Sequence, residues 1–182
     1  MEKIIGIDNK SYTVKATALS LIIYRANFGR DGLQDITSLI PTDAQNAAQI
    51  DGMTILKLFW SFIKAADKNA PPFDLWLQNQ NMQPLKIAAA VLHQVVELSL
   101  ANVQTKIKSK QVSAGGTSEP ITTELLLYRA TDRGLNLLDF EYMTIGMVMD
   151  YLTLCNNVDI EGRNKKPEEP TRMATQSDID AF

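Results

Sequence analysis

The chain has 182 residues, of which 45% are hydrophobic and 21% are charged, and its formal net charge is -3. This composition excludes an intrinsically disordered chain, and the length allows one good core plus a small second unit. One cysteine, Cys155, and one histidine, His93, exclude a disulfide framework and a zinc site of the usual Cys and His type.

The charge is divided unevenly along the chain. Residues 1–111 hold 12 Lys and Arg against 9 Asp and Glu, whereas residues 112–182 hold 6 against 12. We therefore expect two units with different partners, and the acidic second half argues against a broad nucleic-acid surface. No signal peptide and no apolar run of bilayer length is evident, so we expect a cytoplasmic protein that contacts no membrane.

The first elements predicted are two short strands, Lys3 to Ile7 and Ser11 to Lys15, joined by a tight turn as a β-hairpin. Two strands alone are marginal in water, so the hairpin must pack on helices or pair with another chain. Its role is either a lid on the core or a contact between copies of the chain. A helix from Thr17 to Phe28, ended by Gly29, and a short helix over 33–39 follow.

The stretch 53–66 is predicted to be the central helix, because it is apolar over most of its circumference. Its neighbouring aromatics Phe59 and Trp60 indicate core packing rather than a ligand pocket, since no convergent polar groups accompany them. Phe73 to Leu77 supply a bulky plug set against this helix. Everything else in the first unit is expected to pack around it.

A long helix is predicted from Pro84 to near Lys108, with an apolar face that thins out toward its end. A helix that is longer than its core often presents the surplus to a partner. We therefore expect Leu98, Val103 and Ile107 to contribute to a partner-binding surface, although fraying of the helix end into a linker explains the pattern equally well.

The fold class predicted is mainly α, with an N-terminal β-hairpin packed on a small helical bundle, a flexible linker and a small helical C-terminal unit. The divisions are residues 1–108, a Ser- and Gly-rich linker at 109–120, helices at 121–158, and a flexible acidic tail at 159–182. Two or three helices of this size are near the limit for independent stability, so the C-terminal unit is expected to dock on another surface.

The sequence contains no recognisable catalytic or cofactor-binding pattern. Gly115 and Gly116 lack the Lys and Ser or Thr of a phosphate-binding loop, and His93 has no nucleophile or acid nearby in sequence. We therefore expect an interaction protein with no enzymatic activity and no cofactor or metal.

Residues of both halves resemble the tail assembly chaperones of long-tailed phages and prophages. The second-half residues are similar to the extra domain that these proteins gain by a programmed ribosomal frameshift. The similar residues are Tyr24, Arg25, Phe28, Gly29, Arg30 and Asp31, then 58–67 and 73–77, then Gly134, Leu135, Leu138, Asp139, Met143, Thr144, Ile145, Gly146 and Asp150, and finally Arg172, Ala174, Thr175, Gln176, Asp178, Ile179 and Phe182.

The resemblance implies a protein that self-associates, coats the aggregation-prone tape measure protein and recruits subunits of the major tail (tube) protein. It implies a place in the host bacterial cytoplasm and absence from the mature virion. In the second half, we expect the tube-binding residues to include Asp139, Phe140, Tyr142 and Asp150, and the docking peptide at the end to use Ile179 and Phe182. A frayed terminus is the simpler interpretation of that peptide.

Two other functions are compatible with the residues. One is a helical adaptor or regulator that binds nucleic acid or a transcription complex, for which steep salt dependence of binding would be diagnostic. The other is a small hydrolase, which would need a nucleophile that the sequence does not reveal.

Overall fold

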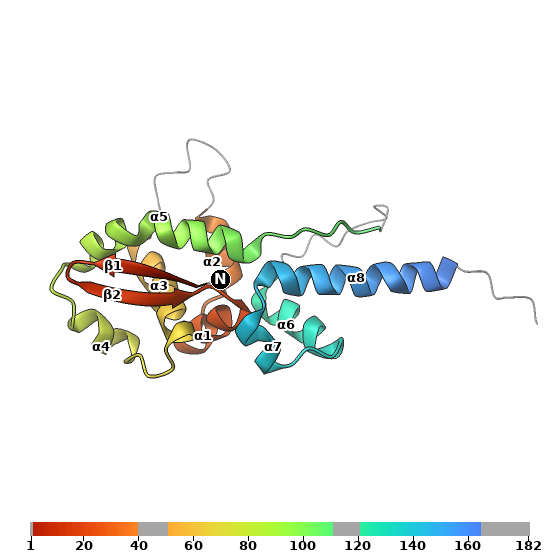
Figure 1. The fold of residues 1–182 in the computed structure, drawn as a ribbon, viewed down its shortest axis with the longest axis horizontal. Coiled ribbons are helices and arrows are strands. Elements are labelled where there is room, and N and C mark those ends of the chain that lie inside the picture. The colour runs from red at the N-terminus through yellow and green to blue at the C-terminus, as the bar shows by residue number, and fades with distance from the viewer. Residues whose placement is uncertain (1, 40–50, 111–120, 165–182) are drawn as a thin grey trace, which may run out of the picture.

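The computed structural model describes residues 2–39, 51–110 and 121–164. Within them the fold is mainly α with an N-terminal antiparallel hairpin, as predicted (Figure 1). The hairpin pairs β1 (Glu2–Ile7) with β2 (Lys10–Lys15) in a register that sets Ile5 opposite Tyr12. The helices are α1 (Ala18–Phe28), α2 (Gly32–Ser38), α3 (Gly52–Ala66), α4 (Phe73–Gln78), α5 (Pro84–Val103), α6 (Thr123–Asp132), α7 (Leu137–Tyr142) and α8 (Ile145–Asn164).

Helix α3 lies at the centre of the N-terminal elements, as its composition predicts. It packs against α5, α1 and β2, and its large side chains Leu58, Phe59 and Phe62 are fully buried. Each such side chain contributes roughly 1.5 to 3 kcal/mol when it is withdrawn from water. Aromatic rings of α1 and α4 surround the helix: the Phe28 and Phe73 ring centroids are 5.1 Å apart, edge to face. The Phe59 and Trp60 pair is therefore core, as predicted.

Helix α3 begins at an aspartate that caps its first turn. Asp51 accepts hydrogen bonds from the backbone N–H of Met53 (3.0 Å) and the hydroxyl of Thr54 (2.9 Å). These bonds, the first of them most strongly, lower the pKa of the Asp51 carboxyl below its ordinary value of 3.8, because they favour the charged form.

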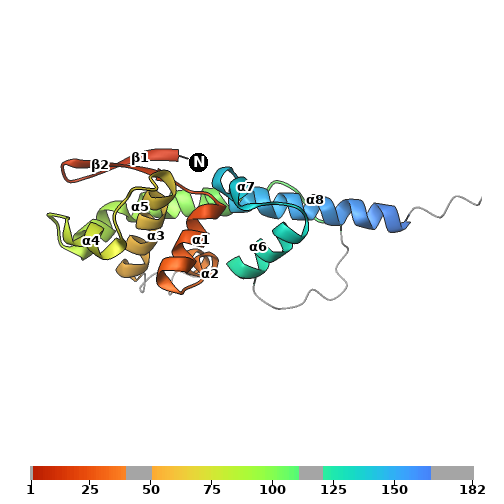
Figure 2. The ribbon, with the colours of Figure 1, turned by 90° about the horizontal axis from the view of Figure 1, so that it is seen from below.

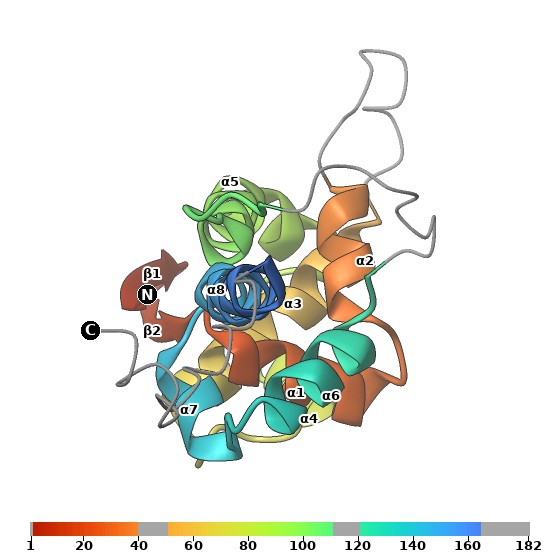
Figure 3. The ribbon, with the colours of Figure 1, turned by 90° about the vertical axis from the view of Figure 1, so that its right-hand side faces the viewer.

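The C-terminal helices share the core of the N-terminal ones. Leu126 of α6, Phe140 of α7 and Ile145 and Val148 of α8 belong to one continuous buried cluster with residues of α1, α3 and α5. Helix α8 starts against the end of α5 and then projects away from the N-terminal helices (Figures 1 and 2). Viewed along α8, α5 lies on one side of it, and α6 and α7 lie on the other (Figure 3).

Two predicted boundaries are wrong. Helix α5 ends at Val103, not near Lys108, and residues 104–110 run without regular structure along α8. Helix α8 continues to Asn164, so the tail that was expected to begin at 159 is helical over its first six residues. Both differences have one cause: 104–110 and α8 contact each other, and neither segment reveals that partner in its own periodicity. Residues 111–120 and 165–182 lie outside the described part.

Helix α5 needs a further correction. By length and composition it is the one helix in the described residues that could cross a membrane, with a mean hydropathy of 1.3 and 33% of its apolar window buried. The prediction that no apolar run has this length is therefore wrong. One such helix is weak evidence for a span, because core helices pass the same test, and the α5 stripe of Ile87, Val91, Val95 and Leu98 is fully buried in the core.

Three segments that are distant in sequence meet at the buried side chain of Asn102. Its Oδ1 accepts from the backbone N–H of Ile145 (3.1 Å), and its Nδ2 donates to the carbonyl of Thr17 (3.4 Å). Beside it, the N–H of Ala18 donates to the carbonyl of Met143 (2.8 Å). The starts of α1 and α8 are thus joined to the last turn of α5. We call these contacts the Asn102 junction.

Replacing Asn102 with alanine should lower the free energy of unfolding by about 1 to 3 kcal/mol, because it removes two hydrogen bonds and leaves the buried N–H of Ile145 without its acceptor. Urea denaturation of the full chain measures the change. Asn156→Ala, on an exposed turn of α8, is the control and should change the stability by less than about 0.5 kcal/mol. Equal stability of the two variants would contradict a structural role of the junction.

The Asp51 cap should contribute to the pH dependence of stability. Its pKa is lowered in the folded chain, so the contribution is present above the unfolded pKa of about 3.9 and is lost as the pH falls through the folded pKa. Asp51→Asn keeps a capping side chain but cannot ionise, so the stability of this variant should fall less steeply below about pH 4. Denaturation midpoints measured from pH 7 to 2.5, with exposed Asp74→Asn as the control, test this.

Candidate partner-binding surface

Large apolar side chains are exposed mainly on the C-terminal helices. Thirteen large hydrophobic residues in the described part are exposed, and eight of them lie between Ile121 and Val158. A large contiguous apolar patch on the surface of a folded protein usually indicates an interaction site. The eight are Ile121, Tyr128, Leu137, Leu138, Tyr142, Met147, Leu154 and Val158.

Helix α7 holds three of these side chains on a single short helix. The Asn136 side chain caps it, and the Asp139 carboxylate accepts a hydrogen bond from the Asn136 N–H (2.7 Å). Together these bonds form a capping box. Phe140 is buried and anchors the helix in the core, and this orientation leaves Leu137, Leu138 and Tyr142 67 to 72% exposed. We call these three side chains the α7 patch.

Helix α8 carries a second apolar stripe. Met147, Tyr151, Leu154 and Val158 recur at i, i+4, i+7 and i+11, which places them on one face. The other faces of α8 are occupied, one by α6 and one by residues 104–110. We call these four side chains the α8 stripe.

Tyr151 connects the stripe to the turn between α6 and α7. Its hydroxyl donates to the carbonyl of Arg133 (2.6 Å). The pKa of Tyr151 is raised above its ordinary value of 10.0, mainly by a hydrogen bond with Cys155 and then by burial, and the negative charge of Asp139 on α7 adds to the shift. The α8 stripe is therefore linked through Tyr151 to the turn that precedes α7.

Two residues that were expected to bind a partner are buried. Leu98 belongs to the α5 stripe that packs against α3, and Phe140 is the core anchor of α7, so neither side chain is available at the surface. These predictions are wrong because each residue lies on the inward apolar stripe of its own helix. The end of α5 accordingly offers no continuous face of Leu98, Val103 and Ile107; the last two are half-buried.

The two acidic residues that were expected to bind a partner instead form hydrogen bonds within the chain. Asp139 caps α7, and the carboxylate of Asp150 accepts from the backbone N–H groups of Lys106 (3.0 Å) and Ile107 (2.9 Å). Of the predicted partner-binding residues in the described part, Tyr142 is the one large apolar side chain that is mostly exposed. Ile179 and Phe182 lie outside the described residues.

Most of the exposed apolar residues were not predicted to bind a partner. The residues that were expected to bind a partner do not include Met147, Leu154 or Val158 of α8. The sequence does contain a signal for them. The α8 stripe recurs at helical spacing on a different face from the buried residues of α8, and a helix needs only one apolar face for one core contact.

In the three described ranges, no group of three or more His, Cys, Asp or Glu side chains could hold a metal ion. Comparison of the chain with protein-family models, with curated proteins and with solved structures found no match. The class that the geometry defines is thus a helical protein with an exposed apolar surface on its C-terminal helices.

Removing the Asp150 carboxylate should release residues 104–110 from α8. Hydrogen bonds to a charged acceptor contribute about 1.5 to 3 kcal/mol each, and proteolysis follows the population of the open form. In Asp150→Ala, trypsin should therefore cleave after Lys106, Lys108 and Lys110 about tenfold faster or more. Asp159→Ala removes the same charge from the opposite face of α8 and is the control. Equal cleavage rates in the two variants would contradict the contact.

Proposed function

We propose that this chain is a phage tail assembly chaperone that keeps the tape measure protein soluble and recruits subunits of the tail tube during assembly. Its place would be the host bacterial cytoplasm, and it would be absent from the mature virion. The proposal begins with the residues in both halves that resemble this family. It names three partners: the tape measure protein, the major tail (tube) protein and further copies of the chain.

The observation that supports the proposal best is the concentration of exposed apolar side chains on α7 and α8. A chaperone that holds unassembled subunits needs an accessible apolar surface, because the partner surfaces that it covers are themselves apolar and would otherwise aggregate. The surface belongs to the acidic half of the chain, where residues 112–182 carry a net charge of -6. We assign tube-subunit binding to the α7 patch and the α8 stripe.

The tape measure protein and self-association are assigned to the N-terminal elements. Ile4 on β1 is 70% exposed, and Leu100 on α5 is 42% exposed. The hairpin has two strands, so its outer edges can accept a further strand from another chain. This division gives each half of the molecule its own partner.

The proposal is tested by capture of the two partners with variants of the full chain. The C-terminal helices share a core with the N-terminal ones, so separated halves would not be folded controls. The double variant Leu138→Asp, Tyr142→Asp should lose about tenfold or more in affinity for the tube subunit, because charges would replace two apolar contacts at an interface centre. Its capture of the tape measure protein should be unchanged.

The reciprocal variant and a matched control complete the test. Ile4→Asp should reduce tape-measure capture and leave tube capture intact, and Leu75→Asp, at a half-exposed position on α4, should change neither. If the unmodified chain captured neither partner, the proposed function would be wrong. If the α7 variant lost both partners equally while remaining folded, the division of labour would be wrong.

A further inference from the structure

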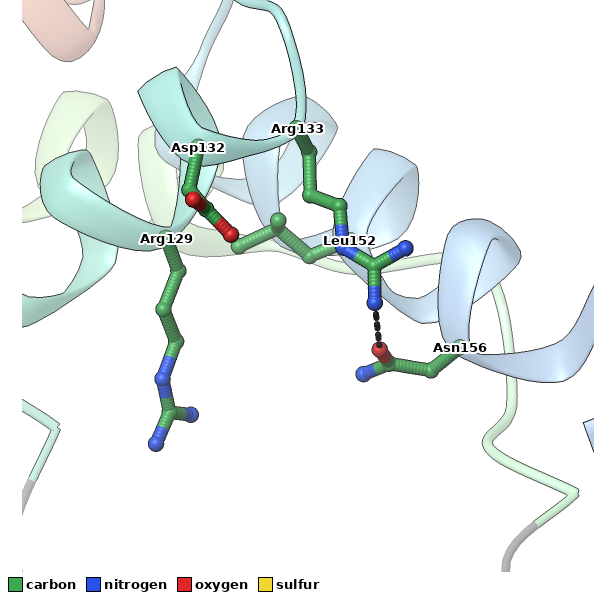
Figure 4. Close-up of a pocket in the computed structure, with 5 residues that line it drawn as sticks. All are labelled: Arg129, Asp132, Arg133, Leu152 and Asn156. Atoms are coloured by element: carbon green, nitrogen blue, oxygen red, sulfur yellow. Dashed lines mark hydrogen bonds between the residues drawn. The ribbon is translucent and has the colours of Figure 1, made fainter. Parts of the chain in front are cut away.

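A groove runs between α6 and α8. Its two hollows share Arg129, Leu152 and Asn156. The apolar end, of about 140 Å³, is lined by Ile121, Leu125, Leu126, Met149, Leu152 and Thr153 together with Arg129 and Asn156. The polar end, of about 250 Å³, is lined by Arg129, Asp132, Arg133, Leu152 and Asn156 (Figure 4).

The two arginines of the groove differ in what they contact. Arg133 is engaged, because its guanidinium donates to Asp159 (2.7 Å) and to Asn156 (3.4 Å). Arg129 extends away from both Arg133 and Asn156 (Figure 4), and no carboxylate of the described residues forms an ion pair with it. An exposed guanidinium at the rim of an apolar hollow is suited to a ligand that combines a carboxylate with a bulky apolar group.

The chain contains such a ligand in its own sequence. Residues 178–182 read Asp, Ile, Asp, Ala, Phe, so that bulky apolar side chains alternate with carboxylates. This pattern matches the groove in chemistry, with Ile179 and Phe182 suited to the apolar end and Asp180 to Arg129. The thioether of Met149, which lines the apolar end, makes favourable contacts with aromatic rings in proteins.

The connecting segment is long enough for the peptide to reach the groove. Helix α8 ends at Asn164, and the 15 residues back to Met149 span roughly 22 Å at a rise of about 1.5 Å per residue. Residues 165–179 could span up to roughly 50 Å if extended, at about 3.3 Å each. Attachment to the same molecule gives the peptide an effective concentration on the order of millimolar, so a weak contact suffices.

We propose that the groove between α6 and α8 binds residues 178–182 of the same chain, with Phe182 in the apolar end and Asp180 on Arg129. The bound peptide covers Leu125 and Leu152 until a partner takes it up. The same peptide then serves two purposes in turn, as a cover for its own groove and as an arm for another protein. This inference stands independently of the proposed function.

Disulfide trapping in the full chain tests the contact. In a Cys155→Ser background, Ala181→Cys is combined with Leu125→Cys in the groove or, as a matched control, with Leu154→Cys on the open face of α8. Leu154 is closer to residue 181 along the chain than Leu125, so random encounters of the tethered peptide would favour the control. We expect the Leu125 pair to form an intramolecular disulfide at least about tenfold faster than the control.

Two further measurements make the result decisive. Adding Arg129→Glu should reduce the rate for the Leu125 pair to that of the control, and an undiminished rate would overturn the contact of Asp180 with Arg129. Equal rates for the two cysteine pairs would overturn the proposal, as would disulfides that form only between molecules and become slower on dilution. Partner capture is not measured in this experiment, so its failure would leave the proposed chaperone function untouched.

Discussion

The arrangement of this molecule depends on the Asn102 junction, where one buried amide forms hydrogen bonds with the backbone of two other segments. A helix start has free N–H groups, and burying them without partners costs free energy. Asn102 supplies an acceptor to the first residue of α8 and a donor to the carbonyl that precedes α1. A polar side chain at the end of the apolar α5 stripe thus joins the start of α8 to α5 and to the start of α1.

A second polar contact repeats this arrangement between α2 and α6. Asp31 caps α2 through the N–H groups of Leu33 and Gln34, and its carboxylate also accepts from the N–H (2.8 Å) and hydroxyl (3.0 Å) of Thr123 at the start of α6. Arg25 of α1 pairs with Glu124 next to it (2.7 Å). Arg25, Asp31, Met143 and Ile145 lie at these two contacts. In this structure they join the two halves of the chain.

The sequence predicts the fold class, the hairpin and the central and long helices, but not α7 as a separate helix, and it fails mainly where the cause is non-local. Helical periodicity, caps and prolines suffice for the hairpin and for α3 as the centre, because those signals lie within each segment. The end of α5 and the extension of α8 depend on contacts between residues 104–110 and Asp150 or Asn157, which are more than 40 positions away. Leu98 and Phe140 were misassigned because periodicity shows that a stripe exists but not which neighbour covers it.

The projection of α8 has a geometric consequence for simultaneous binding. From Ile145 to Val158, 13 residues further on, α8 rises roughly 20 Å along its axis, so the far end of this helix stands well clear of the hairpin and α5. A subunit bound at the Val158 end of α8 and a polypeptide bound across the hairpin would be separated by more than the diameter of one helix. One molecule could thus hold two cargoes at once without a steric clash, with α8 acting as a spacer.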